Sequence, residues 1–221
     1  MELSKEQIDQ LFAFTKKKLV HWYDLQAELV DHLASRIEEE QEKNPALDFD
    51  RALAKVYDGF GIFGFAHIVQ QKTAQLERSS RRLWWKTFKA FFAWPKIVLV
   101  AATVWLIWQS AHLLPGLVTV IGLIAALIVS EVQLWRYRSA LRKMTRPLLL
   151  LELSPLRYTV GFFFFQLIVS IGDTGKWTVV FVFGVITLLC TLINIASYKA
   201  HQRVQAEAEA LYPEAFAPAQ A

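Results

Sequence analysis

One junction divides this chain of 221 residues into two parts that must fold in different environments. Residues 78–96 carry six positive charges, no acidic residue and many Trp and Phe side chains. The apolar run that follows begins at Ile97 and contains no Lys, Arg, Asp or Glu before Glu131. Lysine and arginine collect on the cytoplasmic side of a bilayer, and aromatic rings settle at the level of the headgroups. The junction therefore predicts the point where the chain enters a membrane.

The two parts also differ in charge. Residues 1–77 hold nine Lys and Arg against fourteen Asp and Glu, a net charge of −5, and residues 78–221 hold fifteen against six, a net charge of +9. The basic excess lies beside apolar segments, so we expect a bilayer with anionic headgroups as its counter-charge and no direct contact with nucleic acid. The first twenty residues contain acids and no apolar core, so we expect no secretory signal there.

Four apolar segments predict a transmembrane domain over residues 97–198. A helix needs roughly 20 residues to cross the apolar core of a bilayer, and the third segment is short for this. We expect the third helix to begin earlier, near Pro147, with a kink at Pro155; the alternative is a short amphipathic piece before a thin span. The four predicted spans cover about residues 95–114, 117–135, 156–171 and 177–198.

The charges of the loops predict the topology. The loop from Arg136 to Arg157 holds six Lys and Arg against Glu152, whereas the loops on either side hold few or none. Positive charge stays inside, so we expect the N-terminus, this loop and the tail, residues 199–221, in the cytoplasm. This describes a multi-pass protein of a bacterial cytoplasmic (inner) membrane. Glu131 lies close to the inner interface, and we interpret it as a carboxylate paired with a loop arginine.

Residues 1–77 predict a small, acidic, all-α cytoplasmic domain. Ser4 and Gln7 form a capping-box pattern that starts a first helix. A second helix is expected over residues 22–43, and Asp48 is a plausible cap for a third over residues 49–57. A glycine-punctuated turn follows at residues 60–65. The next helix has no break before Trp94, so we expect it to run directly into the bilayer. In the second helix the core residues repeat every four positions, at Leu25, Leu29, Leu33 and Ile37.

The junction at residues 78–96 predicts a segment that lies at the membrane interface. Trp84, Phe88 and Phe91 recur at helical spacing on one face, while basic residues lie on the other faces. The side chains that we expect at the interface are Arg78, Arg81, Arg82, Trp84, Trp85, Lys86, Phe88, Lys89 and Trp94.

The second helix carries the side chains with the most chemical character. Asp24, Glu28 and His32 are spaced four apart and share a face, with His21 nearby. One helix rarely closes a metal shell alone, and no other predicted helix offers a matching pair. We therefore predict no metal and no cofactor, and keep these four residues as a weak alternative. The sequence has no glycine-rich phosphate loop, catalytic triad pattern or HExxH motif, so it favours a protein that is not an enzyme.

Residues 23–40 and 47–61 resemble the helical domain of HAAS-type (DUF1700-like) bacterial membrane proteins. The resemblance rests on Asp31-His32, Asp48, Ala52-Leu53 and Phe60-Gly61. The turn departs from the Leu-Gly-x-Pro of that family. The chain is also similar to Bacteroidetes-type membrane proteins of no settled function. The resemblance implies a signalling module of the kind often linked to PadR-type helix-turn-helix regulators, with several transmembrane helices after it.

These observations favour a non-enzymatic integral membrane protein whose cytoplasmic domain binds a protein partner in signalling or regulation. The alternative is a structural or accessory subunit of a larger membrane complex, and a homo-oligomer is compatible with either. The residues that we expect to contact the partner are Phe60, Phe63, Phe65, Asp31 and His32.

Overall fold

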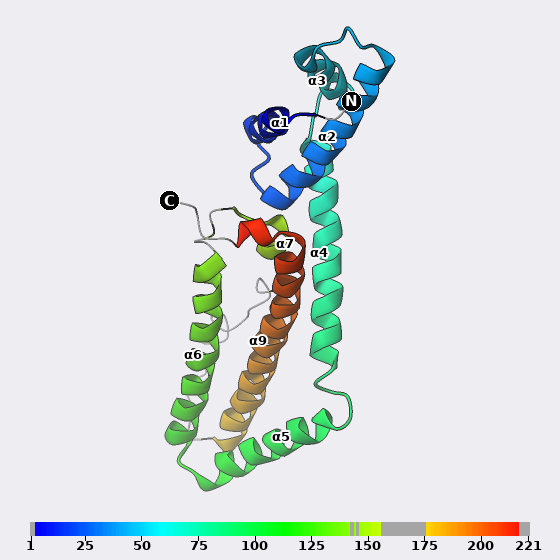
Figure 1. Cartoon of the computed structure of the whole chain (residues 1–221). Helices are drawn as coiled ribbons and strands as arrows, with labels where there is room; N and C mark the ends of the chain where they lie inside the picture. The colour runs from blue at the N-terminus through cyan, green and yellow to red at the C-terminus, as the bar shows by residue number, and fades with distance from the viewer. Residues whose placement is uncertain (1–2, 142–143, 145, 156–175, 217–221) are drawn as a thin grey trace. The chain divides into compact units, whose positions relative to one another are not determined.

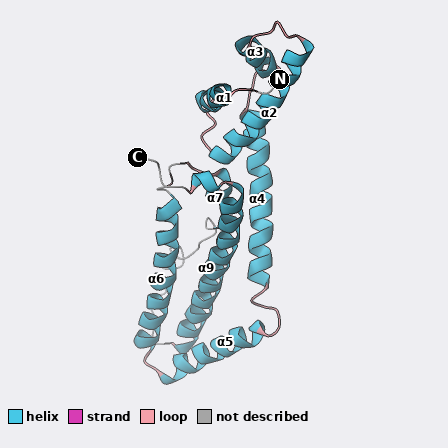
Figure 2. Ribbon diagram, in the orientation of Figure 1, coloured by secondary structure: helices cyan, strands magenta, loops and turns pink. Residues whose placement is uncertain are grey.

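The structure is a computed structural model that describes residues 3–141, 144, 146–155 and 176–216, and every regular element in this part of the chain is helical (Figures 1 and 2). The chain forms two compact units. Unit 1 contains residues 1–77, 144–153 and 208–221, and unit 2 contains residues 78–143 and 154–207. The helices are α1 (Lys5–Lys17), α2 (Tyr23–Lys43), α3 (Phe49–Asp58), α4 (Ala66–Lys89), α5 (Lys96–Leu113), α6 (Gly116–Leu141), α7 (Leu149–Glu152) and α9 (Trp177–Leu211), followed by a 3-10 turn at Pro213–Ala215.

The helix starts of unit 1 agree with the sequence signals. The Ser4 hydroxyl accepts from the Gln7 N–H at 3.3 Å, and the Gln7 side chain accepts from the Ser4 N–H at 2.8 Å, which confirms the capping box. The Asp48 carboxylate accepts from the Arg51 N–H at 3.0 Å and caps α3. These caps satisfy amide groups that the first helical turn leaves without a partner.

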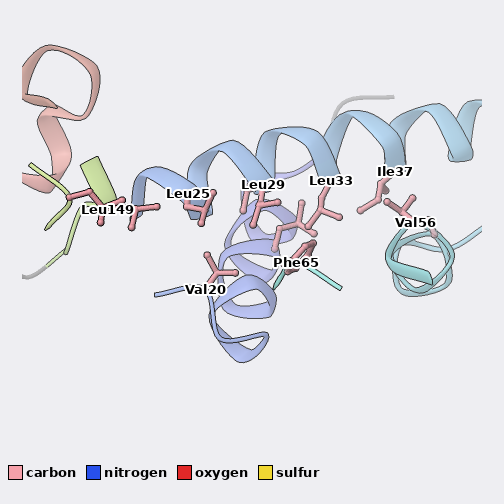
Figure 3. Close-up of a cluster of buried hydrophobic side chains, with 12 residues drawn as sticks. Val20, Leu25, Leu29, Leu33, Ile37, Val56, Phe65 and Leu149 are labelled. Carbon is pink, nitrogen blue, oxygen red and sulfur yellow. The ribbon is translucent and has the colours of Figure 1, made fainter. Parts of the chain in front are cut away.

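The core of unit 1 lies along one side of α2. Figure 3 shows the α2 side chains that repeat every four residues facing Val20, Phe65 and Val56, with Leu149 at the N-terminal end of the helix. The predicted core of α2 is confirmed, since its four repeating residues are almost fully buried: Leu25, Leu29, Leu33 and Ile37.

The turn between α3 and α4 depends on Gly64. Its φ of +49° lies in the left-handed region, and a Cβ there would lie 2.5 Å from the Tyr57 hydroxyl. The close approach brings Phe65 into the core, where its ring packs edge-on against Phe14 and Tyr57. The turn thus fixes one aromatic side chain of the Phe60–Phe65 stretch inside unit 1.

Three helices in the described part of the chain are long and apolar enough to cross a membrane, and they lie wholly or mostly in unit 2: Lys96–Leu113, Gly116–Tyr137 within α6, and Trp177–Leu211. They correspond to the first, second and fourth predicted spans. The third predicted span, residues 156–171, lies outside the described residues. The 35 residues of α9 make a helix of about 52 Å, which exceeds the roughly 30 Å apolar core of a bilayer. Such lengths and compositions are those of a membrane protein.

The helices of unit 2 are joined by close packing and by polar contacts. Gly184 of α9 lies so close to Ile107 of α5 that no Cβ would fit between them. The Asn194 amide of α9 donates to the Glu131 carboxylate at 2.9 Å and to the Ser130 hydroxyl at 3.0 Å, both on α6. The sequence predicted a loop arginine as the partner of Glu131, but this carboxylate bonds to a neighbouring helix.

Two expectations about the membrane boundary are wrong. α4 ends at Lys89 and residues 90–95 form turns, so this helix does not run directly into α5. Pro95 lies at the end of this break, where it disfavours helical geometry at Trp94, directly before α5. Residues 149–152 do not begin the third span either. They form the short helix α7 of unit 1, where Leu149 and Leu153 belong to the core.

Leu33→Ala should open unit 1, because it removes a fully buried side chain from the centre of the α2 core. The loss expected for such a cavity is about 2–5 kcal/mol. Hydrogen exchange of the α1 and α2 amides in the full chain measures it, and His32→Ala, which changes an exposed neighbour, is the matched control. Equal exchange in the two variants would contradict this core.

Candidate functional site

The most specific polar contact of unit 1 is made by the buried carboxylate of Asp24 in the first turn of α2. Its Oδ1 accepts from the Leu149 N–H at 2.9 Å and its Oδ2 accepts from the Leu150 N–H at 3.0 Å. These are amides of the first turn of α7, more than a hundred residues further along the chain. One carboxylate thus caps a helix that belongs to a distant segment.

The contact is reciprocal. The first amide of α2, the N–H of Tyr23, donates to the Pro147 carbonyl at 2.9 Å. The N-cap residue of α2, Trp22, makes no side-chain capping bond, so the distant carbonyl takes that role. The N-terminal ends of two helices therefore satisfy each other, and Asp24 places a negative charge where both helix dipoles are positive.

Apolar burial holds the same segment. Leucines of residues 148–153 are almost fully covered, and two of them join the core cluster that contains Leu25 and Leu29 of α2. The exposed member of this stretch is Glu152, which accepts from the indole N–H of Trp22 at 2.6 Å. The segment lies with its apolar side chains inward and its acid outward. The buried leucines are Leu148, Leu149, Leu151 and Leu153.

Tyr23 contacts residues of two further segments, one before α7 and one after α9. The Arg146 guanidinium lies 4.8 Å from the ring centroid, which is a cation–π geometry. The Tyr23 hydroxyl donates to the Glu214 carboxylate at 3.0 Å, and the Tyr212 ring packs edge-on at 6.3 Å. Burial, and then the Glu214 carboxylate, raise the pKa of Tyr23 above its ordinary value, so the neutral phenol that donates this bond is favoured.

We call this assembly the clasp. It consists of Trp22, Tyr23 and Asp24 of α2 together with residues 146–153 and 212–214. The clasp brings three separate parts of the chain into one unit: the N-terminal helices, the segment after α6 and the segment after α9. Its side chains hold the three segments together by hydrogen bonds, a cation–π contact and apolar burial.

The weak metal alternative is not supported by the positions of its residues. Both Asp24 oxygens accept backbone N–H groups, and Glu28 pairs with Lys72 at 2.6 Å. His21 and His32 are exposed. Within the described residues, no three His, Cys, Asp or Glu side chains are placed to hold a metal ion.

The residues predicted to contact a partner do not lie on one surface. Phe65 is 2% exposed and Phe60 is half-buried against Tyr57 and Phe65, so both rings pack inside unit 1. Phe63 is 73% exposed, and its neighbour Ile62 is 95% exposed. The remaining two predicted contacts, Asp31 and His32, are exposed on α2.

The predicted interface residues are mostly exposed in unit 2, with one clear exception. The five basic side chains and the Trp85 and Trp94 rings are exposed. Trp84 is buried; its indole N–H donates to the Ser197 hydroxyl at 3.0 Å and its ring stacks on Phe88. This indole therefore packs on α9. The exposed basic residues are Arg78, Arg81, Arg82, Lys86 and Lys89.

Sequence reasoning missed the clasp because its signals admit another interpretation. Four consecutive leucines after Pro147 look like the start of a membrane helix. An acid in the first turn of α2 looks like ordinary dipole compensation. A signal was present in Trp22, which starts α2 without a capping side chain and therefore leaves amides that need a partner elsewhere.

Comparison with protein-family models, with curated proteins and with solved structures finds no match for this chain. The resemblance to HAAS-type domains stays a prediction, and the function must be argued from the residues.

Asp24→Ala should release the segment of residues 147–153 from unit 1. The change leaves two buried amides without an acceptor, which costs about 1–3 kcal/mol each. The measurement is hydrogen exchange of the Leu149 and Leu150 amides in the full chain. Asp31→Ala removes an exposed acid from the same helix and is the control. Unchanged protection in Asp24→Ala would contradict a role for this carboxylate in holding α7.

Proposed function

We propose that this chain is a non-enzymatic integral membrane protein of a signalling or regulatory kind, in which unit 1 is a cytoplasmic domain that binds a protein partner. The observation that carries the proposal is the clasp, because it makes the folded state of unit 1 depend on segments that follow two apolar helices after four residues or fewer. A change in those helices can then alter what unit 1 presents. Such a dependence suits the transmission of a signal through the apolar helices.

The composition of unit 1 also supports the proposed topology. One folded unit lies on one side of a membrane, so residues 1–77, 144–153 and 208–221 share a side. In the topology that we propose, α5 leaves that side and α6 returns to it, and the third span expected from the sequence leaves it again before α9 returns. Four crossings with both termini on one side follow, and the basic loop after α6 favours the cytoplasm as that side.

This topology is tested with single cysteines in a Cys190→Ala background, labelled by a membrane-impermeant maleimide in intact cells. Leu114→Cys, between α5 and α6, should react from outside. Asn44→Cys and Arg146→Cys should react only after the cells are permeabilised. Reaction of Arg146→Cys in intact cells, with Asn44→Cys protected, would rule out a single side for the parts of unit 1.

The surface that we propose for the partner is the exposed face of α2 and α3. Asp31 and Glu39 are exposed two turns apart on α2. A shallow cavity of about 360 Å³ adjoins Glu39, and an ion pair between Lys55 and Glu40 lies in its wall. An acidic ridge beside a small depression suits a basic peptide segment of a protein partner. The lining residues are Arg36, Glu39, Glu40, Lys55, Val56 and Gly59.

The partner proposal is tested by affinity purification of the tagged full chain from membranes in gentle detergent. A cytoplasmic protein should copurify with the unchanged chain and be lost by at least about tenfold with Asp31→Lys/Glu39→Lys, since reversed charges oppose a basic partner. Glu42→Lys/Asp50→Lys makes the same change of net charge and should retain it. No copurifying cytoplasmic protein, or equal loss with both variants, would contradict the proposal.

The alternative, an accessory subunit of a larger membrane complex, draws support from unit 2. Among the described residues, the buried Thr187 hydroxyl and Asn194 carbonyl oxygen have no hydrogen-bond partner, which the interior of a membrane protein rarely allows. Native mass spectrometry of the same preparation distinguishes the two functions. Retained integral membrane subunits with no cytoplasmic protein would favour the accessory role.

A further inference from the structure

We propose that unit 1 carries a second binding surface, a basic and apolar patch that docks on a membrane containing anionic lipid. The patch consists of Lys16, Lys17, Leu19, Ile62 and Phe63, and lies in two loops, after α1 and before α4. It shares no residue with the clasp or with the partner surface proposed around Asp31 and Glu39.

Leu19 is the first indication. It follows the end of α1 with a φ of +68°, and the Val20 N–H donates to the Thr15 carbonyl at 3.2 Å across it. This closing turn normally uses glycine at that position, because a side chain strains the left-handed backbone. Leu19 is nevertheless a large apolar side chain that is 75% exposed. A bulky residue in a strained position that gains no burial inside unit 1 indicates a use outside it.

The second loop presents the same chemistry. Ile62 and Phe63 are 95% and 73% exposed between Gly61 and Gly64, both of which have positive φ. The glycines hold two apolar side chains at the tip of a tight turn. Neither side chain contributes to the core, which takes Phe65 from this turn.

The two loops adjoin through Tyr57. The Lys18 ammonium lies 4.2 Å from the centre of the Tyr57 ring, and the hydroxyl of the same ring occupies the space beside Gly64 that a Cβ there would need. Figure 3 shows Val20 and Phe65 on the same side of α2. The contact between Lys18 and Tyr57 therefore joins the loop after α1 to the helix that leads into the second loop.

The positive charge of the patch indicates that its ligand is an anionic lipid surface. Unit 1 residues 1–77 are acidic as a whole, yet three consecutive lysines, residues 16–18, stand exposed beside Leu19. Lysines at a helix C-terminus also compensate the helix dipole, but that role does not require three exposed apolar neighbours. Basic side chains next to projecting apolar ones bind anionic headgroups and insert into the acyl boundary. Because unit 1 is tethered to membrane helices, the lipid surface is always within reach.

The test uses the full chain in nanodiscs with one copy per disc, in the Cys190→Ala background. An environment-sensitive fluorophore is attached at Ala66→Cys, beside the patch, or at Asn44→Cys. Asn44 follows the far end of α2, a helix of about 30 Å, and serves as the control position. With phosphatidylglycerol present, the probe at residue 66 should shift to shorter wavelength and be quenched by lipid-attached nitroxide, and the probe at residue 44 should not.

The variants separate docking from folding. In Leu19→Asn, asparagine adopts the left-handed backbone more easily than leucine, so the resistance of unit 1 to unfolding should be equal or greater. Nitroxide quenching of the probe at residue 66 should nevertheless fall. Ile62→Ser/Phe63→Ser should also reduce quenching. Lys16→Ala/Lys17→Ala should lower the ratio of docked to free unit 1 about fivefold for each lysine, the factor that corresponds to ~1 kcal/mol. Lys43→Ala/Arg51→Ala removes the same charge at the far end of α2 and should leave the ratio unchanged.

Three results would overturn the proposal. The first is equal quenching at residues 44 and 66. The second is an equal decrease in quenching for Lys16→Ala/Lys17→Ala and for Lys43→Ala/Arg51→Ala, which would show a response to net charge alone. The third is a shift that occurs only in discs holding two copies of the chain, which would assign the patch to a contact between copies.

Discussion

The bond between the Asp24 carboxylate and the amides of Leu149 and Leu150 determines what unit 1 is made of. Two helices begin at this point, and each start leaves unpaired N–H groups and a positive dipole end. Brought together without a negative charge, the two ends would repel and leave buried donors unsatisfied. With the carboxylate between them, Leu149 and Leu153 can enter the core of a domain that begins more than a hundred residues earlier.

Rough energies indicate why this polar contact decides the outcome. Four buried leucines contribute about 1.5–3 kcal/mol each, and fixing six residues of backbone costs about 1–2 kcal/mol each. The two totals are nearly equal. Hydrogen bonds to a charged acceptor add about 1.5–3 kcal/mol each, so the carboxylate tips the balance toward docking. A segment held by so small a margin can be released by a modest change elsewhere.

Local sequence rules predict the helices of residues 1–77 well, but they do not predict that two later segments belong to the same unit. Ser4, Asp48 and the spacing of Leu25 to Ile37 act within a few residues of each other, so sequence alone locates them. Docking of α7 is a contact between segments far apart in the chain, and four leucines fit a membrane helix and a soluble core equally well. The bond from Trp84 to Ser197 is hidden from sequence for a similar reason, because an indole at a membrane interface and one bonded to a neighbouring helix have the same sequence pattern.

The clasp is well placed to report on the apolar helices because little chain separates them. Tyr212 directly follows α9, and only residues 142–145 stand between α6 and Arg146. The five steps from Leu141 to Arg146 extend at most about 18 Å, so the connection absorbs only a limited displacement of the end of α6. On the α9 side no residue intervenes, so rotation of that helix acts directly on Tyr212 and on the bond from Tyr23 to Glu214. A nearly balanced clasp on such short connections is compatible with the proposed signalling role, since a small displacement of either helix would be enough to change its contacts.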